Sequence, residues 1–365
     1  MTDPAIPARL SGQVRVVGAG LLGASIGLAL RAQGVDVILD DASPSNLRLA
    51  VDYGAGRLAR EGDDPSIVVV AVPPDVTADA VEAELERYPR AVVTDVASVK
   101  LEPYRELVSR GADLTNYIGS HPLAGRERGG AISARADLFV GRPWVICRDH
   151  ETPRSAFALV EDLALDLGAT PVEMTPEEHD RSVALVSHAP QLVSSLLAAR
   201  LVDAPDQALR LSGQGLRDTV RIASSSPELW VQILGSNAGP VADVLDAFSR
   251  DLASVVDALR QPDAAGSRRA IADTIAAGNT GVARLPGKHG QDRRYATIVV
   301  MVDDRPGELG RLLTELGDIG VNMEDLRLEH SPEAEIGLAE IAVLPEVQRR
   351  AIEDLEARGW RIASV

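Results

Sequence analysis

The side chain best suited to chemistry in this 365-residue sequence is a histidine in the polar segment 119–123. His121 follows two other polar segments, a glycine-rich loop near the N-terminus and the cluster at 94–100. An unperturbed imidazole has a pKa of about 6.5, close to the working pH of a cell, so it can take a proton from a hydroxyl group. If a nicotinamide takes a hydride from the same carbon, the sequence predicts a dehydrogenase with His121 as catalytic proton acceptor.

The glycine-rich loop has the pattern Gly-x-Gly-x-x-Gly at 18–23, between a β-rich run at 14–17 and a helical pattern at 24–33. In this context the first glycine permits a tight turn, the second lets the backbone approach a pyrophosphate, and the third packs helix on strand. Asp40 or Asp41 can accept from ribose hydroxyls and would repel a 2′-phosphate, which favours NAD over NADP; flavin or another nucleotide is the alternative. The residues expected around the cofactor are Gly18, Gly20, Leu21, Leu22, Gly23, Asp40, Asp41, Val72, Pro73, Asp95 and Ser98.

Hydrophobic periodicity divides the chain into parts. Strand patterns at 35–39, 67–72, 91–94 and 144–147 alternate with helical patterns, which predicts an α/β Rossmann domain with a doubly wound parallel sheet over 1–174. Thr175-Pro176-Glu177-Glu178 is typical of a helix start, and the Ala- and Leu-rich stretch 175–278 predicts an all-α substrate and dimerisation domain. A linker is expected at 279–294, and a βαββαβ order over 295–365 predicts a small ferredoxin-like α+β module.

Composition excludes several classes of partner. The formal net charge is −17 and no basic stripe stands out, so nucleic acid and anionic membranes are poor partners. Cys147 is the only cysteine, and its apolar neighbours predict a buried thiol. We expect a cytoplasmic protein, because no signal-peptide core and no apolar stretch of about 20 residues is found. The six histidines show no paired ligand spacing, so no metal is expected.

Five segments taken together resemble the prephenate/arogenate dehydrogenase family of tyrosine biosynthesis. They occur in the family's order within roughly 14–235, and the set is specific although each segment alone is not. The segments are Gly-Ala-Gly-Leu-Leu-Gly-Ala-Ser, Thr-Asp-Val-Ala-Ser-Val-Lys, Gly-Ser-His-Pro-Leu-Ala-Gly-Arg-Glu, Thr-Pro-Glu-Glu-His-Asp and Arg-Asp-Thr-Val-Arg-Ile-Ala.

The resemblance implies the oxidative decarboxylation of prephenate to 4-hydroxyphenylpyruvate. Hydride leaves C4 of the ring for NAD, the C4 hydroxyl loses its proton, and CO2 departs as the ring becomes aromatic. By resemblance His121 is the proton acceptor, Ser98 orients the C4 hydroxyl and His121, and Arg221 anchors a substrate carboxylate. Arogenate, giving tyrosine directly, is the alternative substrate.

Further substrate contacts are expected from His188, Gln191, Arg126 and Glu127. Some relatives carry a histidine where Gln191 stands and a threonine where Arg126 stands, and these differences leave the choice of substrate open. The positive charge of Arg126 favours prephenate, which is a dianion. His179 and His188 are nine residues apart and would lie on opposite sides of a straight helix. We therefore expect His179 to be a structural hydrogen-bonding residue unless a bend intervenes.

The C-terminal region resembles an ACT domain, a module that binds amino acids in many regulated enzymes. Pro306, Gly307 and Asn322 are the expected ligand positions, and tyrosine is the expected effector; a dimerisation module without a ligand is the alternative. A β-hydroxyacid dehydrogenase is disfavoured, because those enzymes use a lysine in the helical domain and 175–278 contains none. The alternative from another class is a non-catalytic sensor of NAD and an amino acid. Such a sensor needs none of Ser98, His121 and Arg221, so the joint presence of these residues disfavours it.

Overall fold

The structure is a computed structural model that describes residues 8–125, 130–148, 153–285, 295–330 and 336–363. The chain divides into two compact units. One comprises Met1–Ser195 with Ile222–Ala247, and the other comprises Leu196–Arg221 with Phe248–Val365.

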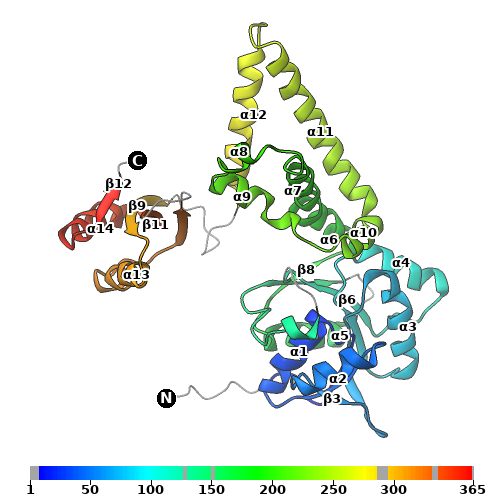
Figure 1. The fold of residues 1–365 in the computed structure, drawn as a ribbon. Coiled ribbons are helices and arrows are strands. Elements are labelled where there is room, and N and C mark those ends of the chain that lie inside the picture. The colour runs from blue at the N-terminus through cyan, green and yellow to red at the C-terminus, as the bar shows by residue number, and fades with distance from the viewer. Residues whose placement is uncertain (1–7, 126–129, 149–152, 286–294, 331–335, 364–365) are drawn as a thin grey trace. The chain divides into compact units, whose positions relative to one another are not determined.

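An eight-stranded sheet forms the centre of the first unit, in the order β3-β2-β1-β4-β5-β6-β7-β8. Strands β3, β6 and β8 are labelled in Figure 1. Neighbouring strands are parallel except for β6 and β7, which pair antiparallel. The β1–β4 neighbours place a crossover in the middle of the sheet, which is the Rossmann arrangement. The strands are β1 (Gln13–Val17), β2 (Asp36–Asp40), β3 (Arg57–Leu58), β4 (Pro65–Val70), β5 (Val92–Asp95), β6 (Tyr117–Pro122), β7 (Pro143–Cys147) and β8 (Thr170–Met174).

Helices cover both faces of this sheet because its central strands are apolar on both sides. On one face α1 (Leu21–Ala32), α2 (Pro44–Asp52) and α5 (Arg154–Asp166) pack on Val14, Val16 and their neighbours. On the other, α3 (Thr77–Arg87) and α4 (Leu101–Arg110) pack on Val68, Val70 and Val93. Cys147 is buried in β7, as expected, and burial raises the pKa of its thiol to about 12.

Two expectations about the sheet were wrong. The sheet is not wholly parallel, since β7 runs against β6 after a connection that lacks a crossover α-helix in its described residues. His121 does not lie in a loop after a strand but within β6, where Tyr117 and Ile118 supply strand-forming side chains and the backbone pairs with β5 and β7.

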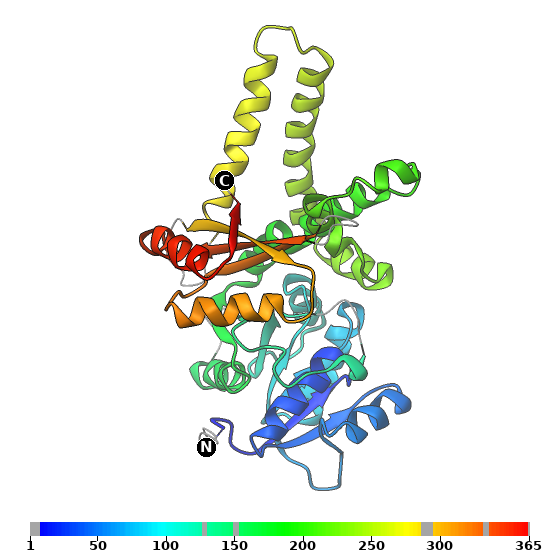
Figure 2. The same cartoon turned by 60° about the vertical axis from the view of Figure 1, so that its left-hand side comes forward.

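Helices make up the region that follows the sheet. Thr175 and Glu178 form the expected capping box, which starts a helix that continues from α6 (Pro176–Val183) through a π-helical turn, η3 (Ala184–His188), into α7 (Ala189–Ala199). The later α11 and α12 run in opposite directions from the turn between them (Figure 2). The other elements are α8 (Asp206–Leu209), α9 (Gln214–Val220), η4 (Arg221–Ala223), α10 (Pro227–Ser236), α11 (Ala238–Arg260) and α12 (Ser267–Val282), with the short turns η1 (Pro74–Val76) and η2 (Ala131–Ser133).

Two further details differ from the sequence prediction. Helix α12 continues to Val282, beyond the expected start of the linker at 279. The helix 176–199 is long and apolar enough to cross a membrane by length and composition, whereas we expected no such stretch. In its first half His179 and Asp180 are buried, and the Asp180 carboxylate accepts from the backbone amides of Lys100 and Leu101 at the start of α4.

A second, four-stranded sheet lies near the C-terminus, with the order β10-β11-β9-β12 and antiparallel pairing throughout. Its βαββαβ sequence of elements confirms the predicted order. From the sequence we expected Asn322 to open the second strand of this module, but strand β10 begins at Asp325, so Asn322 precedes the strand. The elements are β9 (Ala296–Asp303), α13 (Glu308–Asp318), β10 (Asp325–His330), β11 (Ile336–Val343), α14 (Pro345–Ala357) and β12 (Arg361–Ala363).

Candidate active site

The sequence-predicted residues of the first unit gather at one edge of its sheet. Strands β1, β4, β5 and β6 are parallel neighbours, so their carboxyl ends lie together. Four groups follow or occupy these ends: the glycine loop after β1, Val72-Pro73 after β4, the loop with Ser98 after β5, and His121 near the end of β6. This edge is where open α/β sheets bind ligands.

Each glycine of the loop fits its expected task. Gly18 has a φ of +98°, and a Cβ there would lie 2.3 Å from the Ala71 carbonyl oxygen. A Cβ on Gly23 would lie 1.9 Å from the Gly18 oxygen, so this position admits only glycine. A Cβ on Gly20 would meet nothing within 4 Å, which leaves open space at the start of α1. Backbone amides at such a helix start favour a bound phosphate.

The two acidic candidates after β2 differ in their surroundings. Arg15 is fully buried in β1 and forms ion pairs with Asp40 at 2.5 Å and with Glu84 at 2.7 Å. The Asp41 carboxylate instead accepts from the backbone amide of Ala19, inside the glycine loop, at 2.6 Å. Of the two acids left open by the sequence, Asp41 is therefore the one held against the loop.

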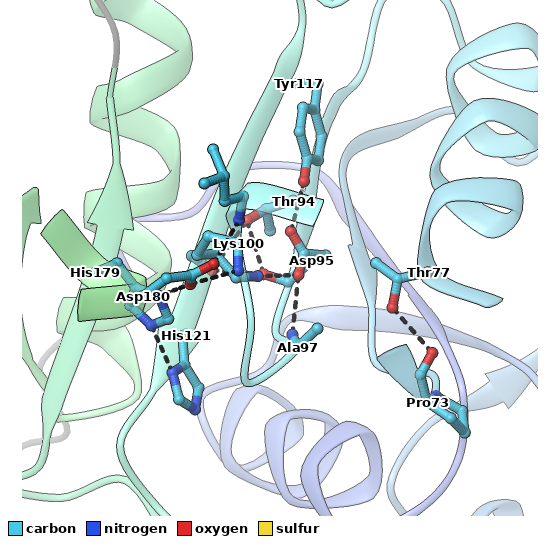
Figure 3. Close-up of polar contacts among 12 residues, drawn as sticks. Pro73, Thr77, Thr94, Asp95, Ala97, Lys100, Tyr117, His121, His179 and Asp180 are labelled. Carbon is cyan, nitrogen blue, oxygen red and sulfur yellow. Dashed lines mark hydrogen bonds and ion pairs between the residues drawn. The ribbon is translucent and has the colours of Figure 1, made fainter. Parts of the chain in front are cut away.

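Asp95 anchors the polar cluster that follows β5 (Figure 3). Its carboxylate is fully buried, forms an ion pair with Lys100, and accepts from the Tyr117 hydroxyl at 2.7 Å and from the Ala97 amide at 2.9 Å. These three donors and the lack of exposed surface show that the carboxylate makes its contacts within the protein. Ser98 lies half-buried in the loop that Asp95 holds.

His121 is at the front of a short chain of hydrogen bonds (Figure 3). Its Nδ1 lies 2.8 Å from Nε2 of His179, and Nδ1 of His179 lies 2.7 Å from Asp180. The Asp180 carboxylate also accepts from the backbone amides of Lys100 at 2.9 Å and Leu101 at 3.0 Å, at the start of α4. The sequence did not reveal that His179 reaches His121, because 58 residues separate them; the His-Asp pair in the first turn of a helix was the only signal.

The electrostatics of this chain favour neutral imidazoles beside an ionised carboxylate. Burial, together with His179, Lys100 and His188, holds the pKa of His121 well below its ordinary value of 6.5. Burial also lowers the pKa of His179, although the hydrogen bond to Asp180 opposes this. Burial raises the pKa of Asp180, but the bonds from His179 and the two amides outweigh it and leave that pKa lowered.

The π-helical turn η3 explains how His179 and His188 both face inward. A π turn holds one extra residue, which rotates the later residues of the helix by about 100° relative to a continuous α-helix. His188 is buried, and its Nδ1 accepts from the Asn237 side chain at 3.1 Å. The centroid of its ring lies 5.9 Å from the centroid of the Trp230 ring, in a T-shaped arrangement. Gln191, one turn later, is also buried and donates to Ser225 at 2.7 Å.

Burying neutral histidines should make the stability of the protein depend on pH. Burial lowers the pKa of His188 to about 4, against about 6.5 in an unfolded chain. The unfolded state therefore binds more protons between these values, so stability is complete above about pH 6.5 and falls as the pH drops, by at most about 1.4 kcal/mol per pH unit for one group. We expect the Tm to decrease from pH 7.5 to 5.5, and to decrease less in His188→Gln. An equal decrease in both proteins would contradict this.

Three other predicted positions remain. Arg126 and Glu127 are outside the described residues. Arg221 opens the short turn η4, is exposed, and belongs to the second unit.

The chain is similar to known proteins over most of its length. The family model described as prephenate dehydrogenase, nucleotide-binding domain, matches residues 26–173, and the one described as prephenate dehydrogenase, dimerization domain, matches 175–272. A probable prephenate dehydrogenase of Streptomyces niveus is 38% identical over 94% of this chain and 98% of its own length. A prephenate dehydrogenase of Bacillus subtilis is 27% identical over 94% and 96%.

Solved structures give the same answer for the fold. The crystal structure of prephenate dehydrogenase from A. aeolicus, in complex with hydroxyphenyl propionate and NAD+, is 25% identical, has a TM-score of 0.65, and aligns over 75% of this chain and 99% of its own. Synechocystis arogenate dehydrogenase is 27% identical with a TM-score of 0.60, over 74% and 99%. The relative from Streptomyces niveus matches nearly the full length of both chains, which confirms the resemblance that the motifs indicated. The chain belongs to the prephenate dehydrogenase family.

Proposed function

We propose that the chain is an NAD-dependent prephenate dehydrogenase that converts prephenate to 4-hydroxyphenylpyruvate, in the cytoplasm. The observation that carries this proposal is a buried imidazole, His121, whose pKa is lowered by burial, at the sheet edge that also holds the dinucleotide loop. Aromatisation of the ring supplies the driving force, so the protein has to position the substrate and accept one proton.

The glycine loop carries the cofactor. The open space at Gly20 and the start of α1 bind the pyrophosphate, and Asp41, whose carboxylate accepts from the loop amide of Ala19, accepts from the ribose hydroxyls. A 2′-phosphate at the same position would be repelled by this carboxylate, which selects NAD over NADP. When bound, NAD accepts the hydride from C4 of the substrate.

His121 accepts the proton of the C4 hydroxyl through its Nε2, the ring nitrogen that does not face His179 (Figure 3). Ser98 orients the hydroxyl group from the loop after β5. His188, Gln191, Arg126 and Glu127 complete the proposed substrate site, with the last two controlling the choice between prephenate and arogenate.

Arg221 binds a substrate carboxylate through its guanidinium fork. We expect Arg221→Ala to raise the KM for prephenate by about 10- to 100-fold and to change kcat less, since a charge-assisted pair contributes about 1.5–3 kcal/mol. Arg217→Ala, an arginine one helical turn away, is the matched control and should keep a KM near that of the wild type. An unchanged KM in Arg221→Ala would remove this residue from the site.

The test of the function is NADH formation from prephenate and from arogenate by the full-length protein. Prephenate is expected to be turned over with the higher kcat/KM, and CO2 release should match NADH. A higher kcat/KM with arogenate would make the chain an arogenate dehydrogenase. Absence of turnover with either, while NAD still binds, would support the non-catalytic sensor instead.

The helical region forms a homodimer. Large apolar side chains such as Leu196, Leu252, Leu259 and Ile275 are between half and two-thirds exposed, far more than a folded monomer requires. A second copy of the chain is the partner that covers them, consistent with the family model for this region. Sedimentation equilibrium should give twice the 38.6-kDa chain mass; a monomer would contradict this.

The C-terminal βαββαβ module is an ACT-like regulatory domain that binds tyrosine. A cavity of about 920 Å³ in this module is lined by Arg305, Arg311, Asp304 and Glu308, which precede and follow Pro306-Gly307 in the sequence. Cations and carboxylates side by side suit the zwitterion of an amino acid. The side chain of Asn322, by contrast, donates to Glu324 at 3.3 Å. Adding tyrosine to the assay above should inhibit NADH formation if this site is regulatory.

A further inference from the structure

Two side chains of α6, His179 and Asp180, lie directly behind His121 and are not used by the proposed reaction. Both are buried, and they link the imidazole of His121 to the start of α4. We propose that this pair fixes the tautomer of His121, with hydrogen on Nδ1 and a lone pair on Nε2, and thereby makes Nε2 the proton acceptor. The catalytic consequence rests on the proposed function of His121, but the tautomer itself does not.

The direction of each hydrogen bond follows from the groups present. An ionised carboxylate only accepts, and Asp180 already accepts from two backbone amides, so Nδ1 of His179 must carry hydrogen and donate to it. A neutral His179 then has only a lone pair on Nε2. Since this nitrogen lies 2.8 Å from Nδ1 of His121, the His121 nitrogen must be the donor. The lone pair of His121 is consequently on Nε2, on the opposite side of the ring.

The assignment requires a neutral His179, because a doubly protonated His179 would donate to His121 and reverse its tautomer. Four charged or titratable groups act on the two imidazoles. They are Asp180 on α6, Asp95 at the end of β5, Lys100 in the segment after β5, and His188 on η3. Burial and Lys100 lower the pKa of His179, whereas Asp180 and Asp95 raise it. The net effect is a lowered pKa, which favours the neutral ring. The Lys100–Asp95 ion pair lies within the same buried cluster.

The same pair stabilises the charge that forms on His121. As the O–H bond of the C4 hydroxyl breaks, an N–H bond forms at Nε2 and the imidazole becomes a cation. Its Nδ1 hydrogen stays bonded to His179, and the negative charge of Asp180, one ring further, offsets the new positive charge. No proton needs to reach His179, so His179 and Asp180 are positioning residues. The logic is that of a carboxylate that orients a catalytic imidazole in serine hydrolases.

Long-range ¹H–¹⁵N correlation spectra of the full-length protein, labelled at histidine and free of ligands, test the tautomer directly. Comparison with His121→Asn assigns the His121 signals. Between pH 6.5 and 8 we expect Nδ1 of His121 to appear protonated and Nε2 unprotonated. The opposite tautomer, or a ring protonated at both nitrogens, would overturn the proposal whatever reaction the protein catalyses.

Variants of His179 test the consequence. His179→Phe removes the acceptor and should lower kcat by about 10- to 100-fold with little change in KM, and should mix the two tautomers of His121. His179→Gln offers an amide oxygen to His121 and an amide hydrogen to Asp180. This variant should recover most of the wild-type kcat and most of the single tautomer of His121. Glu177→Gln removes an exposed carboxylate from the same helix and should behave as wild type.

Two results would contradict this role for His179. One is a wild-type kcat in His179→Phe, and the other is a His179→Gln variant no better than His179→Phe while both show a wild-type Tm. If His179→Phe does not fold, the wild-type spectrum alone decides the tautomer.

Discussion

His121→Asn is expected to lower kcat by about 10²–10⁴-fold while the Kd for NAD stays nearly unchanged. Asparagine has an amide hydrogen that can still donate to His179, but it offers no basic nitrogen to the substrate hydroxyl. The loss should therefore appear in the chemical step rather than in binding. Steady-state kinetics with prephenate gives kcat, and fluorescence titration gives the Kd for NAD.

The pH profile separates this role from a general loss of structure. In the wild type, log kcat should fall at acid pH as His121 becomes protonated, with a midpoint below 6.5 because burial lowers this pKa. This limb should be absent from the residual activity of His121→Asn. A wild-type kcat in the variant, or an unchanged acidic limb, would exclude His121 as the proton acceptor.

The second large effect is expected from two alanine substitutions in the glycine loop. In Gly23→Ala the new Cβ would lie 1.9 Å from the Gly18 oxygen, so the loop must shift, and we expect a destabilisation of about 1–3 kcal/mol together with loss of NAD binding. In Gly20→Ala the methyl group meets open space, so the fold should tolerate it. The same methyl group occupies the path of the pyrophosphate, and the Kd for NAD should rise by about 10- to 100-fold.

Each variant is the control for the other, because both add one methyl group to the same loop. Thermal unfolding measures stability, and calorimetric titration measures the Kd for NAD. A wild-type Tm for Gly23→Ala, or a wild-type Kd for Gly20→Ala, would show that the loop does not work as described.

Local patterns predicted local structure well. Thr175 and Glu178 form the capping box that their spacing indicated, and the glycines at 18, 20 and 23 meet the constraints expected of each. The βαββαβ order near the C-terminus was also clear from alternation and turns. Each of these signals depends on residues that lie close together in the sequence.

The errors arose where distant residues decide the structure. The strand containing His121 is stabilised by pairing with β5 and β7, which no short window reveals. The π turn at 184–188 turns His188 inward with no residue type that marks it. Lys100 and Tyr117 are partners of the Asp95 carboxylate, and the sequence alone did not indicate either contact. Side-chain partners of this kind become visible only in three dimensions.

A crystal structure of the protein with NAD+ and 4-hydroxyphenylpyruvate would show most directly whether His121 handles the substrate proton. We predict the phenol oxygen of the product within about 2.6–3.2 Å of Nε2 of His121, with the ring carbon that bears it facing C4 of the nicotinamide. A phenol oxygen held by other groups, with His121 away from the nicotinamide, would contradict the account.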